Sequence, residues 1–177
     1  RSYSVTGVQT CALPIWRYVM RTLALSPVVK SLIGPPIIAD GHGNWKYTLP
    51  RDLYYRTSIE PPAEIFFENE WVMIYKHAIV LKKSYSWDGA TCAHDYPWVV
   101  YPSCLHDAIY QFAEDIARAW GCSVWTVLKW GNHVFNEAMI REGAPKHARR
   151  RYYGAVTVAG YAFHQVMRLV KLKRIKL

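Results

Sequence analysis

The hydrophobic pattern of the chain changes its period at Pro102, and this change constrains the fold more than any other feature. From Trp45 to Trp87, short runs rich in aromatic and β-branched residues are separated by turn residues, which predicts strands. After Pro102, apolar residues recur at helical spacing. Strands first and helices afterwards are typical of an α+β fold. We therefore expect a small antiparallel β region at about 45–87, packed on a three-helix half at about 103–170.

The individual elements follow from local signals. Glu68-Asn69-Glu70 predicts a hairpin turn, and Ser103 is the expected N-cap of the first helix of the second half. The expected β-prone runs are Lys46–Leu49, Leu53–Thr57, Ile65–Phe67, Trp71–Tyr75 and Ala78–Leu81. The expected helices span about 17–33, 103–119 and 123–141, with a last one from Lys146 onward; Asp40–Asn44 is expected to be a turn-rich link, and Gly121 and Gly143-Ala144-Pro145 are the expected breaks.

Residues 1–15 need separate treatment. The segment Val5-Thr6-Gly7-Val8-Gln9-Thr10-Cys11-Ala12-Leu13-Pro14-Ile15 looks like the in-frame translation of a common sequencing adapter. We treat 1–15 as an artefactual N-terminal scar of metagenomic assembly and expect the native N-terminus to be missing, so export stays open. The remainder, 16–177, is expected to form a single domain with a basic tail at 168–177.

Composition supports a folded chain. Of the 177 residues, 51% are hydrophobic and 15% aromatic, which is too apolar for a disordered protein. No apolar stretch reaches the length needed to span a bilayer, so no transmembrane segment is expected. Outside the scar there remain Cys92, Cys104 and Cys122, too few for a disulfide framework, which favours a reducing compartment.

The formal charge of +9 is unevenly distributed. No acidic residue follows Glu142, whereas nine basic residues do. A neutral body with a basic end is typical of a protein that faces an anionic partner, which here can be nucleic acid, a lipid surface or an acidic protein. Alternatively, these residues form a solvated helix end. The residues expected to make such contacts are Arg149, Arg150, Arg151, Lys171, Lys173, Arg174 and Lys176.

Polar groups that can do chemistry gather in three segments. Asp88 follows a strand and begins a tight turn, whereas His106 and Tyr110 lie four residues apart and share one helix face, with Asp107 beside them. Asn132 lies on the facing helix. A carboxylate next to an imidazole fixes its tautomer and raises its basicity, so these residues predict a general acid–base site. Asp88, His106 and Asp107 are also the expected ligands if a divalent metal is bound.

Three motifs resemble one uncharacterised family. The first motif is Ser84-Tyr85-Ser86-Trp87-Asp88-Gly89-Ala90-Thr91, the second is Leu105-His106-Asp107-Ala108-Ile109-Tyr110-Gln111-Phe112, and the third is Phe135-Asn136-Glu137-Ala138-Met139. A tyrosine-rich basic helix from Arg149 follows them. Together these features resemble the domain-of-unknown-function family 1353 of phages, prophages and bacteria. The resemblance covers roughly residues 45–165 and implies a phage or bacterial setting, in the host cytoplasm or associated with the virion. It implies no established reaction. The family usually has glycine where Ser84 stands and aspartate where Asn132 stands, which puts the activity of the site in question.

Structural interpretations stand beside these functional ones. Asp88-Gly89 is also a common turn pair, and a buried His106 satisfied by Asp107 can simply hold two helices together. Tyr110 can be a core ring, and His133 with Glu137 is expected to form an exposed pair on the second helix. The repeated Cys-x-His of Cys92-Ala93-His94 and Cys104-Leu105-His106 lacks the spacing of common zinc sites.

Three functions therefore remain open. The first is a small hydrolase in which His106 activates water, Asp107 orients it or holds a metal, and Asp88 completes the site. The spacing His106-Asp107-x-x-Tyr110 is similar to that of the catalytic helix of secreted phospholipases A2, but this sequence lacks their glycine-rich calcium loop and paired cysteines. The doublet His106-Asp107 also resembles that of the metal-dependent His-Asp phosphohydrolases. Those enzymes need further histidines on helices. The second is a non-catalytic phage accessory or virion-associated protein with a structural His-Asp pair. The third is a binder of anionic surfaces through the basic C-terminal helix.

Overall fold

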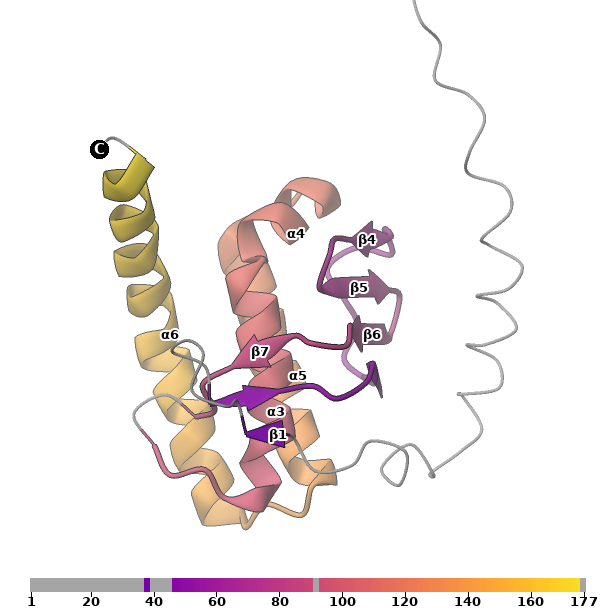
Figure 1. Cartoon of the computed structure of the whole chain (residues 1–177), viewed down its shortest axis with the longest axis vertical. Coiled ribbons are helices and arrows are strands. Elements are labelled where there is room, and N and C mark those ends of the chain that lie inside the picture. Colours follow the sequence, from indigo (N-terminus) through magenta and orange to yellow (C-terminus); the bar gives the residue numbers. More distant parts are fainter. Residues whose placement is uncertain (1–36, 39–45, 91–92, 176–177) are drawn as a thin grey trace, which may run out of the picture. The chain divides into compact units, whose positions relative to one another are not determined.

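The first half of the chain forms two antiparallel sheets. The computed structural model of the protein describes residues 37–38, 46–90 and 93–175. The larger sheet has the strand order β3-β6-β5-β4, and the smaller one has the order β1-β2-β7 (Figure 1). The strands are β1 (Ile37–Ile38), β2 (Tyr47–Thr48), β3 (Leu53–Arg56), β4 (Phe67–Glu68), β5 (Val72–Tyr75), β6 (Ala78–Leu81) and β7 (Ser86–Trp87).

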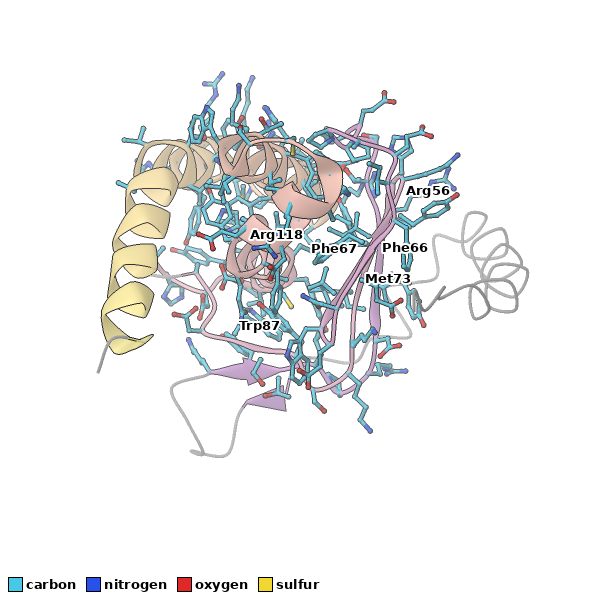
Figure 2. The ribbon with its side chains drawn as sticks, turned by 90° about the horizontal axis from the view of Figure 1, so that it is seen from above. Arg56, Phe66, Phe67, Met73, Trp87 and Arg118 are labelled. Atoms are coloured by element: carbon cyan, nitrogen blue, oxygen red, sulfur yellow. The ribbon has the colours of Figure 1, made fainter. Side chains whose placement is uncertain are left out.

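One face of the larger sheet packs toward the helices (Figure 2). Phe67, Ile74 and Ile79 are paired across β4, β5 and β6, and all three are buried. In Figure 2, Phe67 lies between this sheet and the helices, whereas the neighbouring Phe66 is about half exposed. The expected hairpin turn is confirmed: the Asn69 side chain accepts hydrogen bonds from the backbone N–H groups of Trp71 and Val72, which is how a short polar side chain stabilises a turn.

The second half is helical, as the sequence predicts, but with four helices instead of three. They are α3 (Pro97–Gln111), α4 (Ala113–Trp120), α5 (Val124–Arg141) and α6 (Lys146–Ile175). The expected helix at 103–119 is therefore wrong at its start and in its continuity. It begins at Pro97 and is interrupted at Phe112, whose backbone leaves the helical region.

The N-cap expected at Ser103 is also wrong. Tyr96 is extended and Pro97 occupies the first helical turn, a position at which its missing N–H costs nothing. Pro102 lies inside α3 rather than before it. The Ser103 hydroxyl instead donates to the Val100 carbonyl and accepts from the Trp87 indole N–H at 3.2 Å, which ties β7 to α3.

The remaining helix boundaries are confirmed. Ser123 caps α5 by accepting the Thr126 N–H, and Gly121 ends α4 with a left-handed backbone at φ 62°. α3 and α5 run side by side and approach closely at Gly131, where an added Cβ would lie 2.8 Å from the Ile109 side chain. The predicted helix at 17–33 and the predicted link Asp40–Asn44 lie outside the described residues.

Side-chain bonds join the sheets to the helices and complete the expected α+β fold. The indole N–H of Trp120 donates to the Ile65 carbonyl at 2.9 Å, and that of Trp130 donates to the Ile59 carbonyl at 3.4 Å. The described residues all fall within one compact unit, residues 35–177. Among the helices that the structure describes, none has the length and apolar character needed to cross a membrane.

Candidate acid–base site

The turn after β7 positions Asp88, which is the residue that the N-terminal half of the chain contributes to the site. β7 ends at Trp87, which is fully buried against α3, so Asp88 leaves the sheet where the sheet meets that helix. Gly89 follows with a φ of 83°, a left-handed conformation that L side chains rarely adopt. Asp88 itself is exposed, so the turn presents a carboxyl group to solvent at the edge of the core.

His106 and Asp107 come from the middle of α3. The His106 side chain is 11% exposed and that of Asp107 is 26% exposed. The imidazole Nδ1 lies 3.4 Å from Asp107 Oδ1. The two adjacent residues therefore differ in access: the carboxyl group reaches solvent, whereas the imidazole lies behind it.

Asn132 on α5 holds the other side of the imidazole. Its Oδ1 lies 3.1 Å from His106 Nε2 and accepts the Tyr110 hydroxyl at 2.8 Å, while its Nδ2 donates to the Val156 carbonyl of α6 at 3.5 Å. The carbonyl can only accept, so it fixes the orientation of the amide. Since Asn132 Oδ1 is then an acceptor, His106 carries its proton on Nε2, and the Nδ1 lone pair faces Asp107.

Aromatic rings enclose the imidazole. The Tyr110 ring lies 4.0 Å from the His106 ring between centroids, and the Phe135 ring of α5 lies 5.1 Å away. Burial raises the pKa of the Tyr110 hydroxyl to about 12, even though its hydrogen bond to Asn132 lowers it. Tyr110 therefore stays a neutral donor at physiological pH and serves to position the amide.

Asp107 is the group whose titration is most altered in this site. Its pKa is raised from 3.8 to about 6, first by burial and then by the charge of Asp88 and a hydrogen bond with it, while His106 lowers it. The carboxyl groups of Asp88 and Asp107 therefore lie close enough together that the charge of Asp88 makes ionisation of Asp107 less favourable.

The structure brings together all five residues that the sequence predicts for the site. Asp88 contacts Asp107, Asp107 faces His106, and His106 and Tyr110 meet at Asn132. Across residues 37–38, 46–90 and 93–175, no three His, Cys, Asp or Glu side chains are grouped so that they can hold a metal ion. We therefore assign no metal to Asp88, His106 and Asp107, and derive the chemistry from the side chains themselves.

Sequence reasoning missed the groups that complete the site. The Val156 carbonyl and the Phe135 ring give no polar signal in the sequence, because one is backbone and the other reads as core. The predicted exposed pair of His133 and Glu137 is wrong. His133 bonds the Tyr153 hydroxyl at 3.1 Å, whereas Glu137 is buried against the sheet.

Glu137 instead anchors α5 to the loop after β3. Its carboxylate accepts hydrogen bonds from the Thr57 hydroxyl and from the N–H and hydroxyl of Ser58, and it pairs with Arg141. Burial alone would raise its pKa, but these partners together lower the pKa of Glu137 below its usual value. Every one of these partners stabilises the charged form, which makes this cluster structural.

The basic residues of α6 differ in exposure. Arg150 and Arg151 are exposed near the start of the helix and Arg149 is half-buried, and the first turn has no acidic residue. Lys171, Lys173 and Arg174 lie on the last turns of the same helix, and Lys176 falls outside the described residues.

Comparisons of the chain with protein-family models, with curated proteins and with solved structures found no match. The resemblance to the domain-of-unknown-function family 1353 therefore stays a prediction from the motifs. What the site can do follows from its own geometry.

Proposed function

We propose that the chain is a phage-type hydrolase that works by general acid–base catalysis. The observation that carries this proposal is the position of the Asp107 carboxyl group, between Asp88 and the His106 imidazole, with a pKa of about 6. A catalytic group works best when its pKa lies near the working pH, so that it can both take up and release a proton. Asp107 meets this condition, and a quarter of its side chain is open to solvent.

The carboxyl pair has the composition that hydrolysis requires. In the proposed step, the ionised carboxylate removes a proton from water, and the water oxygen bonds to the electrophilic carbon or phosphorus of an ester. The bond to the leaving oxygen breaks, and that oxygen takes the proton held by the other carboxyl group. The pair ends with one proton, as it began, so no further reactant is needed.

His106 has a supporting role in this proposal. The sequence suggests the imidazole as the group that activates water, but its side chain is 11% exposed and ring neighbours lie at 4.0 and 5.1 Å. The accessible base is therefore Asp107, and the Nδ1 lone pair of His106, 3.4 Å from Asp107 Oδ1, orients that carboxyl group by accepting its proton in a hydrogen bond when it is protonated. This division of roles agrees with the amide of Asn132, which directs the Nδ1 lone pair toward Asp107.

The phage setting rests on the motif resemblance. One structural fact supports it at a position where the chain departs from the family pattern. Ser84, which stands where the family usually has glycine, has a φ of 70°, in the region that glycine adopts without strain. We accordingly propose that the protein acts in the host cytoplasm or with the virion.

The test is hydrolysis of carboxylic-ester and phosphoester panels by the full chain, with and without a chelator. Asp107→Asn should lower the rate about 10²–10⁴-fold, the usual contribution of a general acid–base group. The matched control is Asp115→Asn, an exposed aspartate on α4 paired with Arg118. If wild type and Asp107→Asn hydrolyse the panels at one rate, Asp107 is not the catalytic group and the pair is structural. If neither protein hydrolyses any substrate, the non-catalytic accessory protein is favoured. Loss of activity with chelator alone would restore the metal hypothesis.

A second function is favoured by the exposed arginines of α6. Arg150 and Arg151 are exposed on the second turn of α6 and follow Arg149 directly, so three adjacent cations repel one another and an anionic partner would relieve this repulsion. Binding of a nucleic acid or of anionic vesicles should then weaken steeply with salt. Replacing both with glutamine should reduce the affinity, whereas Arg118→Gln on α4, 77% exposed, should not.

A further inference from the structure

Asp95, which precedes α3, makes three hydrogen bonds with one buried carboxylate. Its Oδ1 accepts the Ala90 N–H at 2.7 Å, and its Oδ2 accepts the Lys46 ammonium at 2.6 Å and the Tyr47 hydroxyl at 3.1 Å. Only 9% of the Asp95 side chain is exposed. The carboxylate thus connects the turn after β7 with the residues of β2.

The same carboxylate fills the space beside Gly89. A Cβ placed on Gly89 would lie 2.5 Å from Asp95 Oδ2 and 2.6 Å from its Oδ1, closer than real Cβ contacts. Asp95 therefore fixes both residues that follow Asp88: it bonds the backbone of Ala90 and packs directly on Gly89.

The charge of Asp95 is balanced within this cluster. Burial would raise its pKa, but the Lys46 ammonium, the Ala90 N–H and the Tyr47 hydroxyl outweigh burial and lower the pKa of Asp95. Asp95 therefore stays ionised, and its contacts hold the turn that follows Asp88.

We propose that Asp95 is a positioning residue of the acid–base site, which holds Asp88 against Asp107 by bracing Gly89 and Ala90 on β2. The inference rests on the proposed function, because that function makes Asp88 and Asp107 an acid–base pair. Its test, however, does not require the protein to hydrolyse any substrate. A bracing residue of purely structural value would change stability alone. A positioning residue must also change the titration of Asp107.

The experiment is a carbon-13 titration of the aspartate carboxyl groups in the full chain, with the Asp107 signal assigned through Asp107→Asn. In wild type, Asp107 should titrate at about 6. In Asp95→Ala, Asp88 is released, and the midpoint of Asp107 should fall toward the ordinary 3.8, as it should in Asp88→Asn. Asp95→Asn keeps an oxygen for the Ala90 N–H and should restore most of the wild-type midpoint.

The matched control is Asp52→Ala. Asp52 braces another turn by the same contacts, since it accepts the Lys83 N–H at 2.8 Å and the Tyr54 hydroxyl at 3.4 Å. Its loss should lower the melting temperature and leave the titration of Asp107 unchanged. Gly89→Ala is a second variant for the case that Asp95→Ala fails to fold, and it should shift Asp107 in the same direction.

The proposal is overturned if Asp107 titrates as in wild type in folded Asp95→Ala or Gly89→Ala, or if Asp52→Ala shifts it equally. The outcome is independent of the proposed function. A titration that moves in a protein without hydrolytic activity would support the positioning role and remove the hydrolase.

Discussion

Gly160 of α6 faces the hydroxyl group of Tyr110 on α3 so closely that an added Cβ would lie 2.5 Å from that oxygen. The same hydroxyl donates to Asn132 Oδ1 at 2.8 Å and therefore cannot move away freely. α6 thus closes the buried end of the network, and its approach depends on the absence of a side chain at this one position.

Gly160→Ala should therefore destabilise the protein. Alanine in an exposed helix usually stabilises by about 1 kcal/mol relative to glycine. At Gly160 the added methyl should instead cost about 1–3 kcal/mol, because it displaces Tyr110 from Asn132. Gly154→Ala on the same helix meets nothing within 4 Å and should show the ordinary gain. Chemical denaturation of both variants measures this, and equal effects would contradict the close approach.

Asp107→Asn should make the protein more stable at alkaline pH. The folded-state pKa of about 6 lies above the ordinary 3.8, so the folded state holds the proton more tightly than the unfolded chain does. The contribution of Asp107 to stability is then greatest below about pH 4 and falls as the pH rises through 6, by up to about 3 kcal/mol. Asparagine removes this penalty.

Urea denaturation of wild type and Asp107→Asn at pH 5 and pH 8 checks this prediction. The difference between the two proteins should favour the variant more at pH 8 than at pH 5. A variant that is less stable than wild type at pH 8 would support a structural salt bridge between His106 and Asp107.

Asn132→Asp should change the protonation state of His106. In wild type, the amide oxygen accepts from Nε2 and leaves Nδ1 unprotonated, so nitrogen-15 shifts of the imidazole should report the Nε2–H tautomer near pH 8. A carboxylate at position 132 would face Nε2 and, together with Asp107, favour the doubly protonated ring. Unchanged nitrogen shifts in the variant would mean that Asn132 does not set the tautomer.

Glu137→Gln should destabilise the junction between α5 and the loop after β3. The Glu137 carboxylate is mostly buried, whereas the Arg141 side chain is 43% exposed, so the loss of its charge-assisted hydrogen bonds should cost about 1–3 kcal/mol. Because the pKa of Glu137 is lowered, its contribution is present above its ordinary pKa of 4.5 and is lost as the pH falls below that value. Glu64→Gln, an exposed pair with Lys76, is the control and should be near neutral in thermal unfolding.

Two serines should separate the true helix cap from the expected one. Ser123→Ala removes the cap of α5 and should cost about 1 kcal/mol. Ser103→Ala leaves the buried Trp87 indole N–H without its acceptor and should cost about 1–3 kcal/mol. Near-ultraviolet circular dichroism should change more for Ser103→Ala, since the Ser103 hydroxyl accepts the Trp87 indole N–H. An equal change for Ser123→Ala would contradict this assignment.

The sequence predicts the α+β class and several polar residues that lie together, but it does not predict the boundaries of the helix that carries His106. Asp88, His106 and Asn132 carry polar groups at places where the neighbouring residues are apolar, so each stands out, and the spacing on two helices suggests that they meet. The boundaries of α3 depend on Pro97 and Pro102, which are both compatible with a helix start, and only packing against Trp87 decides between them.

Tertiary contacts that cross from one half of the chain to the other could not be predicted. Helical spacing pairs Glu137 with His133, but it does not indicate which side of α5 meets the sheet. Likewise, nothing in Asp95 distinguishes it from an ordinary loop aspartate until Lys46, Tyr47 and Ala90 surround it. The role of such a residue is determined by hydrogen-bond partners about 50 to 80 residues away in the sequence, as the pairs Lys46–Asp95 and Thr57–Glu137 illustrate.

The orientation of the Asn132 amide has a consequence for how protons can travel. Its oxygen receives hydrogen bonds from both the imidazole and the phenol, and an amide oxygen does not pass a proton from one to the other. Protons therefore cannot pass through Asn132 between His106 and Tyr110. Any proton that His106 exchanges with water through this network therefore passes by way of Asp107, whose side chain is partly exposed.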